Sequence, residues 1–340
     1  MLYIHIPFCD SKCHYCAFNS FTTNHHLKND YLNALLEQLR FELERFEVQQ
    51  IETIFIGGGT PSTMPISAYE KIFALLEPYT KATKEITIEA NPSAKKEWIE
   101  EIAKYVSRIS FGVQSFNEAK LKFLGRSHTP KMAIEAIERA AKAGIEHINL
   151  DLIYDCAGDT KELLKNDIDT ALSLPIDHIS AYALTLEEGT PFSGKSELKK
   201  DDADLAYFVA DKIGQKLPQY EVSNFGTPSL HNLGYWELKD YMGVGAGAVG
   251  FLKNRRFYPP SDLHAYISDP LATDEELLSP AELRSEKIFL GLRSIVGVDV
   301  SLLDPKKVEI LLQEEKVEQK EGRIYNKNLF LADEIALFLL

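Results

Sequence analysis

The sequence predicts an α/β fold whose main part is a partial (β/α)6 barrel, open on one side. Strand-like and helix-like segments alternate through roughly the first 185 residues. Six consecutive strand–helix units imply parallel strands joined by right-handed crossovers. Polar or glycine-rich segments follow several of these strands, and ligands of parallel α/β folds bind at that edge of the sheet. The sequence therefore predicts a functional site at the carboxyl ends of the strands.

The predicted strands are short runs rich in β-branched or aromatic residues. They cover residues 2–6, 51–56, 85–89, 108–113, 147–153 and 178–184. The segments between them carry apolar residues at helical spacing. The predicted helices cover residues 31–46, 68–76, 98–105, 132–143 and 163–172.

The sequence predicts two further regions after the barrel. The barrel itself is expected to cover residues 1–190. Residues 191–275 predict a loop-rich extension containing HNLGYW and the glycine-dense YMGVGAGAVGF. Residues 276–340 predict a small C-terminal domain of helices and a β-hairpin.

The composition is that of an ordinary globular protein, with 45% hydrophobic and 26% charged residues. The net charge of −14 argues against a protein held to nucleic acid by phosphate neutralisation. Neither a secretory signal nor an apolar run of about 18 residues is apparent, so we expect a cytoplasmic protein. In that compartment the four cysteines favour metal binding or redox chemistry over disulfides.

Three of these cysteines, Cys9, Cys13 and Cys16, form a C-x3-C-x2-C loop directly after the first predicted strand. Three thiolates on one loop can hold three irons of a 4Fe-4S cluster and leave the fourth iron open. The amino and carboxylate groups of S-adenosylmethionine can chelate an open iron, and reduction of the sulfonium then yields a 5′-deoxyadenosyl radical. Tyr15 is the expected aromatic neighbour of the adenine.

A zinc site is the alternative interpretation of this loop, with His5 or His14 as the fourth ligand. The cluster is favoured because this spacing after the first strand of a β/α array is specific. Cys156 is isolated in the sequence and predicts a buried or incidental thiol.

The chain resembles the radical S-adenosylmethionine proteins of the oxygen-independent coproporphyrinogen oxidase superfamily over nearly its whole length. The motifs that carry the resemblance are YIHIPFCDSKCHYCAFNS, FIGGGTPS, IEANP, ISFGVQSFN, LGRSHT, NLDLIYDCAG and ISAYALTLEEGTPF. This resemblance implies a radical S-adenosylmethionine barrel with a winged-helix-like C-terminal appendage.

The resemblance also implies roles for individual residues. Cys9, Cys13 and Cys16 would ligate the cluster. Gly58 and Gly59 would run along the methionine part of the cofactor, where the absence of side chains allows close backbone approach. Glu89 would hydrogen-bond the ribose of the cofactor. The other cofactor contacts would come from Tyr3, Thr60, Gln114, Arg126 and Asp151.

Two branches of the superfamily compete, the oxidases and the HemW-like haem chaperones. The oxidases carry another cysteine two residues after the third ligand, where this sequence has Phe18. They also carry a long N-terminal extension, whereas the first cysteine here is already Cys9. The segment His231–Trp236 fits the HNxxYW pattern of the chaperone branch. All three features favour the chaperone branch.

In that branch the motif would bind haem. His231 could ligate the iron, and the aromatic pair offers flat surface for a porphyrin face. A structural anchor for a loop is the alternative interpretation of the same residues. The candidate haem-binding residues are His231, Asn232, Tyr235 and Trp236.

The sequence thus favours a haem chaperone that carries a 4Fe-4S cluster and S-adenosylmethionine and passes haem to acceptor proteins, respiratory ones among them. The alternatives are an oxygen-independent coproporphyrinogen oxidase and a radical enzyme that acts on haem or another tetrapyrrole. The interpretation includes a homodimer and peripheral membrane contact through acceptors. The C-terminal domain is expected to cover the open side of the barrel or to contact acceptors, because its charged stretch is too acidic for DNA.

Overall fold

A computed structural model describes all 340 residues, and its main feature is an eight-stranded sheet in the order β7-β6-β5-β4-β3-β2-β1-β8. The first six strands are parallel and neighbour one another in chain order. They are β1 (Leu2–Ile6), β2 (Thr53–Gly58), β3 (Glu85–Ala90), β4 (Arg108–Gln114), β5 (His147–Tyr154) and β6 (His178–Ala183). The predicted α/β fold with a partial barrel is confirmed.

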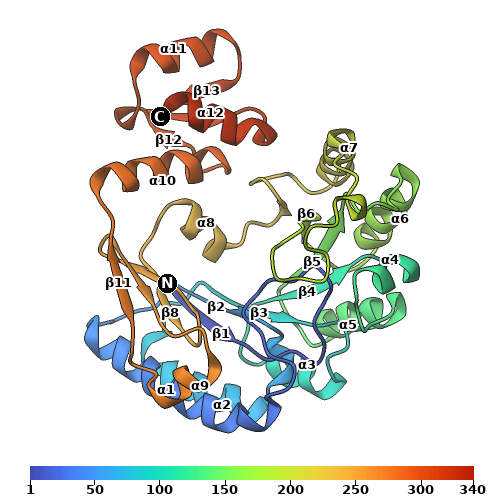
Figure 1. The fold of residues 1–340 in the computed structure, drawn as a ribbon, viewed down its shortest axis with the longest axis vertical. Helices are drawn as coiled ribbons and strands as arrows, with labels where there is room; N and C mark the ends of the chain where they lie inside the picture. Colours follow the sequence, from blue (N-terminus) through green and yellow to red (C-terminus); the bar gives the residue numbers. More distant parts are fainter.

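Helices on the outer face of the sheet connect these strands (Figure 1). They are α1 (Lys28–Arg45), α2 (Ile66–Leu76), α3 (Lys96–Ile102), α4 (Glu118–Phe123), α5 (Pro130–Lys142) and α6 (Lys161–Leu172). The predicted helices begin two or three residues late because apolar periodicity marks the first buried turn and not the cap. Thr129 and Thr160, for example, accept a backbone N–H at the starts of α5 and α6.

The segment predicted as a loop-rich extension contains more regular structure than expected. Its short strands β7 (Asn224–Gly226) and β8 (Met242–Val244) form the two edges of the main sheet. Strands of three residues are too short to show an alternating pattern, which is why the sequence did not reveal them. The segment also holds α7 (Ala203–Gly214), α8 (Leu230–Trp236), β9 (Gly250–Leu252), β10 (Arg255–Tyr258), α9 (Leu263–Ser268) and β11 (Asp274–Leu277).

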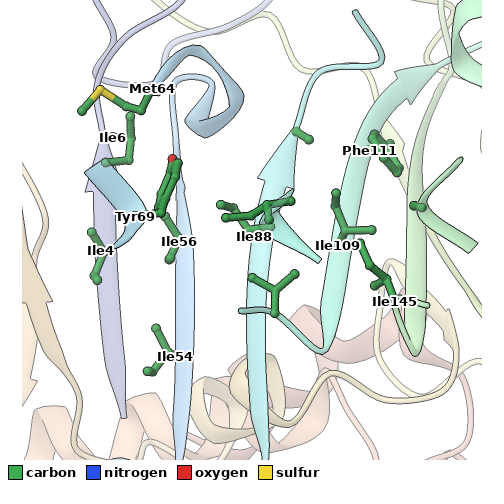
Figure 2. Close-up of a cluster of buried hydrophobic side chains, with 14 of the residues drawn as sticks. Ile4, Ile6, Ile54, Ile56, Met64, Tyr69, Ile88, Ile109, Phe111 and Ile145 are labelled. Carbon is green, nitrogen blue, oxygen red and sulfur yellow. The ribbon is translucent and has the colours of Figure 1, made fainter. Parts of the chain in front are cut away.

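Strand alternation gives the sheet an apolar outer face and a polar inner face. Ile4, Ile54, Ile56 and Ile88 point outward into a cluster that includes Tyr69 of α2 (Figure 2). Each such side chain contributes roughly 1.5–3 kcal/mol when buried. The residues between them along β1, β2 and β3 point inward, and the residues of that inner face are mostly polar or aromatic.

The inner face holds α8 through a buried ion pair. Arg108 Nε lies 3.2 Å from a carboxylate oxygen of Glu85, and both side chains are almost completely buried. The Glu85 carboxylate also accepts the backbone N–H groups of Leu230 and His231, each at 3.0 Å, and the Ser229 hydroxyl at 2.9 Å. A carboxylate therefore caps the first turn of α8 and fixes it against the amino-terminal ends of the strands.

The C-terminal part packs around its own core of 12 buried residues. It consists of α10 (Pro280–Leu292), β12 (Val298–Asp299), α11 (Pro305–Gln313), β13 (Val317–Lys320), β14 (Arg323–Asn326) and α12 (Ala332–Leu339), with a small antiparallel sheet. Figure 1 shows α8 between this part and the main sheet, and α8 contacts both α10 and β2. The backbone of Tyr220 and Val222 pairs with that of Arg293 and Ile295, at 2.9 Å for both hydrogen bonds, and ties the two parts together.

None of the helices is long and apolar enough to cross a membrane.

The ion pair under α8 makes a prediction about stability. Glu85→Ala should lower the free energy of unfolding by roughly 3 kcal/mol, because it leaves the buried Arg108 without its carboxylate and removes the cap of α8. Urea unfolding measures this difference. The control is Glu52→Ala, which removes an exposed ion pair with Lys84 and should cost less than about 1 kcal/mol. Equal losses in the two variants would contradict the anchoring role.

Candidate functional site

The cysteine loop leaves the carboxyl end of β1 and is closed by backbone hydrogen bonds. The Cys9 N–H donates to the carbonyl of Phe21 at 3.1 Å, and the Phe21 N–H donates to that of Pro7 at 2.7 Å. Cys9 is buried, whereas Cys13 and Cys16 are partly exposed, and all three thiols are free. The loop therefore presents three unpaired thiols at the sheet edge where the sequence predicts the site.

The far side of the loop is fixed by the segments that follow β4 and β6. The His14 N–H donates to Leu124 O at 3.1 Å, and His14 Nδ1 lies 2.9 Å from Phe123 O. The Phe192 N–H donates to His14 O at 3.1 Å. Tyr15 packs against a small apolar cluster that includes Leu124 and Phe192. These contacts fix the loop to the segments that follow β4 and β6.

The glycine run after β2 approaches this loop more closely than any side chain would allow. A Cβ on Gly59 would lie 2.9 Å from Phe8 O and 3.0 Å from Cys9 Sγ. Gly58 has a φ of +115°, and a Cβ there would lie 2.5 Å from the His5 ring. Both positions thus require glycine on steric grounds. Gly58 and Gly59 are partly exposed, and Gly59 lies beside Cys9, where the resemblance expects the cofactor.

Two carboxyl groups, Glu89 near the end of β3 and Asp151 in the middle of the longer β5, lie on the inner face of the sheet. Glu89 accepts the Gly58 N–H at 3.1 Å, and burial together with the negative charge of Asp151 raises the pKa of Glu89 to about 8. Burial also raises the pKa of Asp151 to about 6, although the side-chain amide of Asn149 donates to this carboxylate at 2.8 Å. Raised values of this kind are typical of sites that bind polar ligands.

Arg126 brings positive charge to the thiols. Its Nη1 donates to Cys13 Sγ at 3.1 Å and its Nη2 to the carbonyl of Gly112, while its Nε is buried without a partner. Gln114 lies nearby with a φ of +70°, a strained backbone conformation for a residue other than glycine. A guanidinium with an unused buried donor suits a carboxylate ligand.

The contacts of His5 argue against the zinc alternative. Its Nδ1 lies 2.9 Å from the Tyr3 hydroxyl and its Nε2 lies 2.8 Å from Asn19 O, so both ring nitrogens have partners. No three His, Cys, Asp or Glu side chains converge as ligands of a single ion would. A cubane cluster makes a different demand, because each of its three irons takes one thiolate.

These residues fit a 4Fe-4S cluster with S-adenosylmethionine. Three free thiols share one loop, and an open backbone edge, two carboxyl groups and a partly unused guanidinium surround them. The sequence offered His5 only as a zinc ligand, whereas its ring packs under Gly58. The sequence missed Gly57, where a Cβ would meet the Glu89 carboxylate at 2.9 Å. Both lie in the quoted motifs, but only the geometry shows why they matter.

The HNxxYW segment forms most of α8, and its histidine faces the sheet. The ring of His231 lies between Thr53 Oγ1 and the Tyr235 hydroxyl, with 2.9 Å to each, and is completely buried. Burial lowers the pKa of His231 to about 3, which keeps the ring neutral. The ring also packs against Phe55 at a centroid distance of 5.4 Å. Haem ligation by His231 stays a prediction, and it would require one of these two hydrogen bonds to break.

The other motif residues differ in position. Asn232 donates its backbone N–H to the Ser229 side chain as part of the helix cap. Trp236 is partly exposed and lines a groove between α8 and the C-terminal part. Outside the motif, Cys156 is buried as expected, and burial raises its pKa to about 12.

Comparison with known proteins shows which class of protein has this architecture. The profile of the Radical SAM superfamily matches residues 3–171. Among solved structures, coproporphyrinogen III oxidase (HemN) from Escherichia coli matches with a TM-score of 0.81 at 20% identity, covering 99% of this chain and 89% of that one. At this identity the match concerns the fold. The chain is thus a radical S-adenosylmethionine protein, a class built around a 4Fe-4S cluster and that cofactor.

Sequence relatives narrow the class. The haem chaperone HemW of Lactococcus lactis is 37% identical over 322 residues, which cover 89% of this chain and 84% of that protein. HemW of Bacillus subtilis is 36% identical over 319 residues, covering 87% of this chain and 84% of that protein. The chain therefore belongs to the HemW family of the radical S-adenosylmethionine superfamily.

The glycine run makes a prediction about cofactor loading. Gly59→Ala should lose most of the cluster, because the new methyl group would clash with Phe8 O and with Cys9 Sγ. Iron and sulfide per chain after anaerobic reconstitution measure the loss, and circular dichroism checks folding. The matched control is Gly158→Ala, where a Cβ meets nothing within 4 Å. Full cluster content in Gly59→Ala would contradict the close approach.

The raised pKa of Glu89 makes a prediction about pH. A glutamate in the unfolded chain titrates near about 4.3, whereas Glu89 in the folded chain has a pKa of about 8. Between these values the folded state holds a proton that the unfolded state has released, so stability falls as pH rises. From pH 6 to pH 8.5 the cofactor-free protein should lose about 2.5 kcal/mol through this group.

Urea midpoints at the two pH values test this prediction. Glu89→Gln should flatten the dependence, whereas Glu52→Gln, at an exposed carboxylate, should leave it unchanged. Parallel pH profiles for the parent chain and Glu89→Gln would show that Glu89 is ionised throughout the range.

Proposed function

We propose that this chain is a haem chaperone that binds haem and passes it to acceptor proteins. The observation that carries this proposal is the similarity to HemW proteins over almost the whole length, 37% over 89% of the chain for the Lactococcus lactis relative. A match over 89% of the chain extends well beyond residues 3–171, which the superfamily profile matches, so it is not limited to the cofactor site.

We further propose that the site residues serve the cofactors. Cys9, Cys13 and Cys16 would ligate three irons, and bound S-adenosylmethionine would complete the fourth and supply one-electron chemistry at its sulfonium. The other proposed cofactor contacts are those of Tyr3, Tyr15, Gly58, Gly59, Thr60, Glu89, Gln114, Arg126 and Asp151. The free thiols and raised carboxyl pKa values support this assignment.

These side chains would bind and orient the cofactor. Arg126, with its unused Nε, would donate hydrogen bonds to a carboxylate of the cofactor. Glu89 would accept hydrogen bonds from hydroxyl groups when it is ionised, or donate one when it is protonated. The main-chain edge of Gly58 and Gly59 would pair with the amino acid part of the cofactor. Tyr15, packed in its apolar cluster, would cover the adenine.

Phe18 favours the chaperone over the oxidase. It occupies the position where the resemblance places the additional cysteine of the oxidases, and its side chain is 67% exposed at the edge of the cysteine loop. An exposed phenyl group cannot replace a thiol as an acid or ligand. The same proposal includes acceptor proteins, respiratory ones among them, and a homodimer. It also includes a cytoplasmic location, which keeps the thiols reduced.

The proposed function predicts haem transfer without turnover of a porphyrinogen. Anaerobically reconstituted protein should bind haem in a Soret titration, with and without S-adenosylmethionine, and should pass it to a haem-free globin. The same protein incubated with coproporphyrinogen III and a reductant should form no vinyl-bearing product. Vinyl product would establish the oxidase alternative, 5′-deoxyadenosine release with altered haem would support the third alternative, and absence of haem binding would refute the chaperone.

A further inference from the structure

A groove of about 580 Å³ separates α8 from the C-terminal part. Leu233 and Trp236 of α8 form one wall, and Ile295, Val298 and Leu302 contribute to the other. Ile295, in the loop between α10 and β12, is 52% exposed. The volume falls within the range of about 300–1,000 Å³ typical of cofactor pockets. The groove therefore offers a flat ligand apolar contact on both faces.

The two faces of α8 have different roles. His231 and Tyr235 face the inner side of the sheet and hydrogen-bond each other there. Leu233 and Trp236 face the groove instead. The motif predicted to bind haem as one unit is thus divided between a buried anchor and an accessible wall.

The charges at this groove sum to a positive value once the ion pair of Glu237 is set aside. Lys287 lies on its rim without an ion pair, and Arg323 uses Nε and Nη2 for the carbonyls of Val296 and Gly297, so its Nη1 remains available. Of the two acidic residues of the rim, Glu237 pairs with Lys239 at 2.6 Å. Asp299 accepts the Ser301 N–H at 2.8 Å and keeps its negative charge, so two cations face one carboxylate without an ion pair. An apolar ligand with two carboxylates matches this arrangement.

A larger groove of about 740 Å³ lies between α7 and the hairpin of the C-terminal part, but it suits such a ligand less well. Asp211, Glu318 and Glu321 line it and would repel carboxylates. Lys320 lies on the same rim and provides a matched control cation.

We propose that the groove between α8 and the C-terminal part seats haem, with a porphyrin face on Trp236 and the propionates toward Lys287 and Arg323. This inference rests on the proposed function and names the place of the cargo. It differs from ligation by His231, whose ring lies on the opposite side of α8.

The chemistry of the lining has a consequence for release. The groove contains no His, Cys, Met or Tyr side chain, so the iron meets no strong protein ligand there. Haem in this groove is held by apolar contact and by its propionates. An acceptor that supplies an axial histidine therefore removes it downhill in free energy.

Haem titration of the full chain tests the groove, with Soret absorption as the readout. Trp236→Ala should weaken binding about tenfold through lost ring contact. Lys287→Glu should weaken it about fivefold, because it places a negative charge beside a propionate. Lys320→Glu, the control in the other groove, should bind as the parent does. His231→Ala, checked for folding by circular dichroism, should keep the parent's spectrum.

Haem dimethyl ester, which lacks the two negative charges, completes the design. It should bind equally to the parent and to Lys287→Glu, because the repulsion has been removed. The proposal that haem lies in this groove would be overturned if Trp236→Ala and Lys287→Glu both bound haem with the parent's affinity. It would also be overturned if His231→Ala alone altered the Soret band. Failure of the parent chain to bind haem would instead overturn the proposed function itself.

Discussion

The position of α8 is the constraint on which the groove and the attachment of the C-terminal part to the sheet depend, and one carboxylate sets it. Glu85 accepts the first N–H groups of the helix and pairs with Arg108 inside the sheet. Because a buried charge without its partner is costly, this arrangement has few alternatives. It turns one face of α8 toward the inner strands and the other toward the C-terminal part. A surface salt bridge could not hold the helix in this way, because water would compete for each partner.

The inner face of the sheet joins the two sites by packed aromatic rings. Tyr3 hydrogen-bonds His5, which lies under Gly58, and Tyr3 also packs against Phe55 at a centroid distance of 6.2 Å. Phe55 in turn packs against His231 of α8. A cofactor on the glycine run would therefore touch one end of a contiguous row whose other end is His231, on the face of α8 opposite the groove. Such contact offers a physical route by which the two ligands could influence each other's affinity.

The sequence revealed the barrel because its strands and helices follow regular periods, and it revealed the cofactor edge because polar residues follow strand after strand. Cys9, Glu89 and Asp151 needed no more than that rule and the resemblance. The orientation of α8 could not be obtained in this way. Its seven residues carry too few apolar positions to define a face, and its direction depends on Glu85, about 145 residues away in sequence. The sequence therefore left His231 open as a haem ligand or a structural anchor, and the structure adds its hydrogen bonds to Thr53 and Tyr235.

A protein that transfers haem must hold it against dilution and still lose it to the acceptor. An axial histidine works against the second requirement, because the iron–nitrogen bond must break before the cargo leaves. A groove lined by Trp236 and Leu233, with propionate contacts at its rim, can retain haem without bonding to its iron. Apolar contact supplies the retention, and an acceptor with its own ligand gains a bond that the donor never formed. On this argument, the buried hydrogen bonds of His231 keep the helix wall in place and leave coordination of the iron to the acceptor.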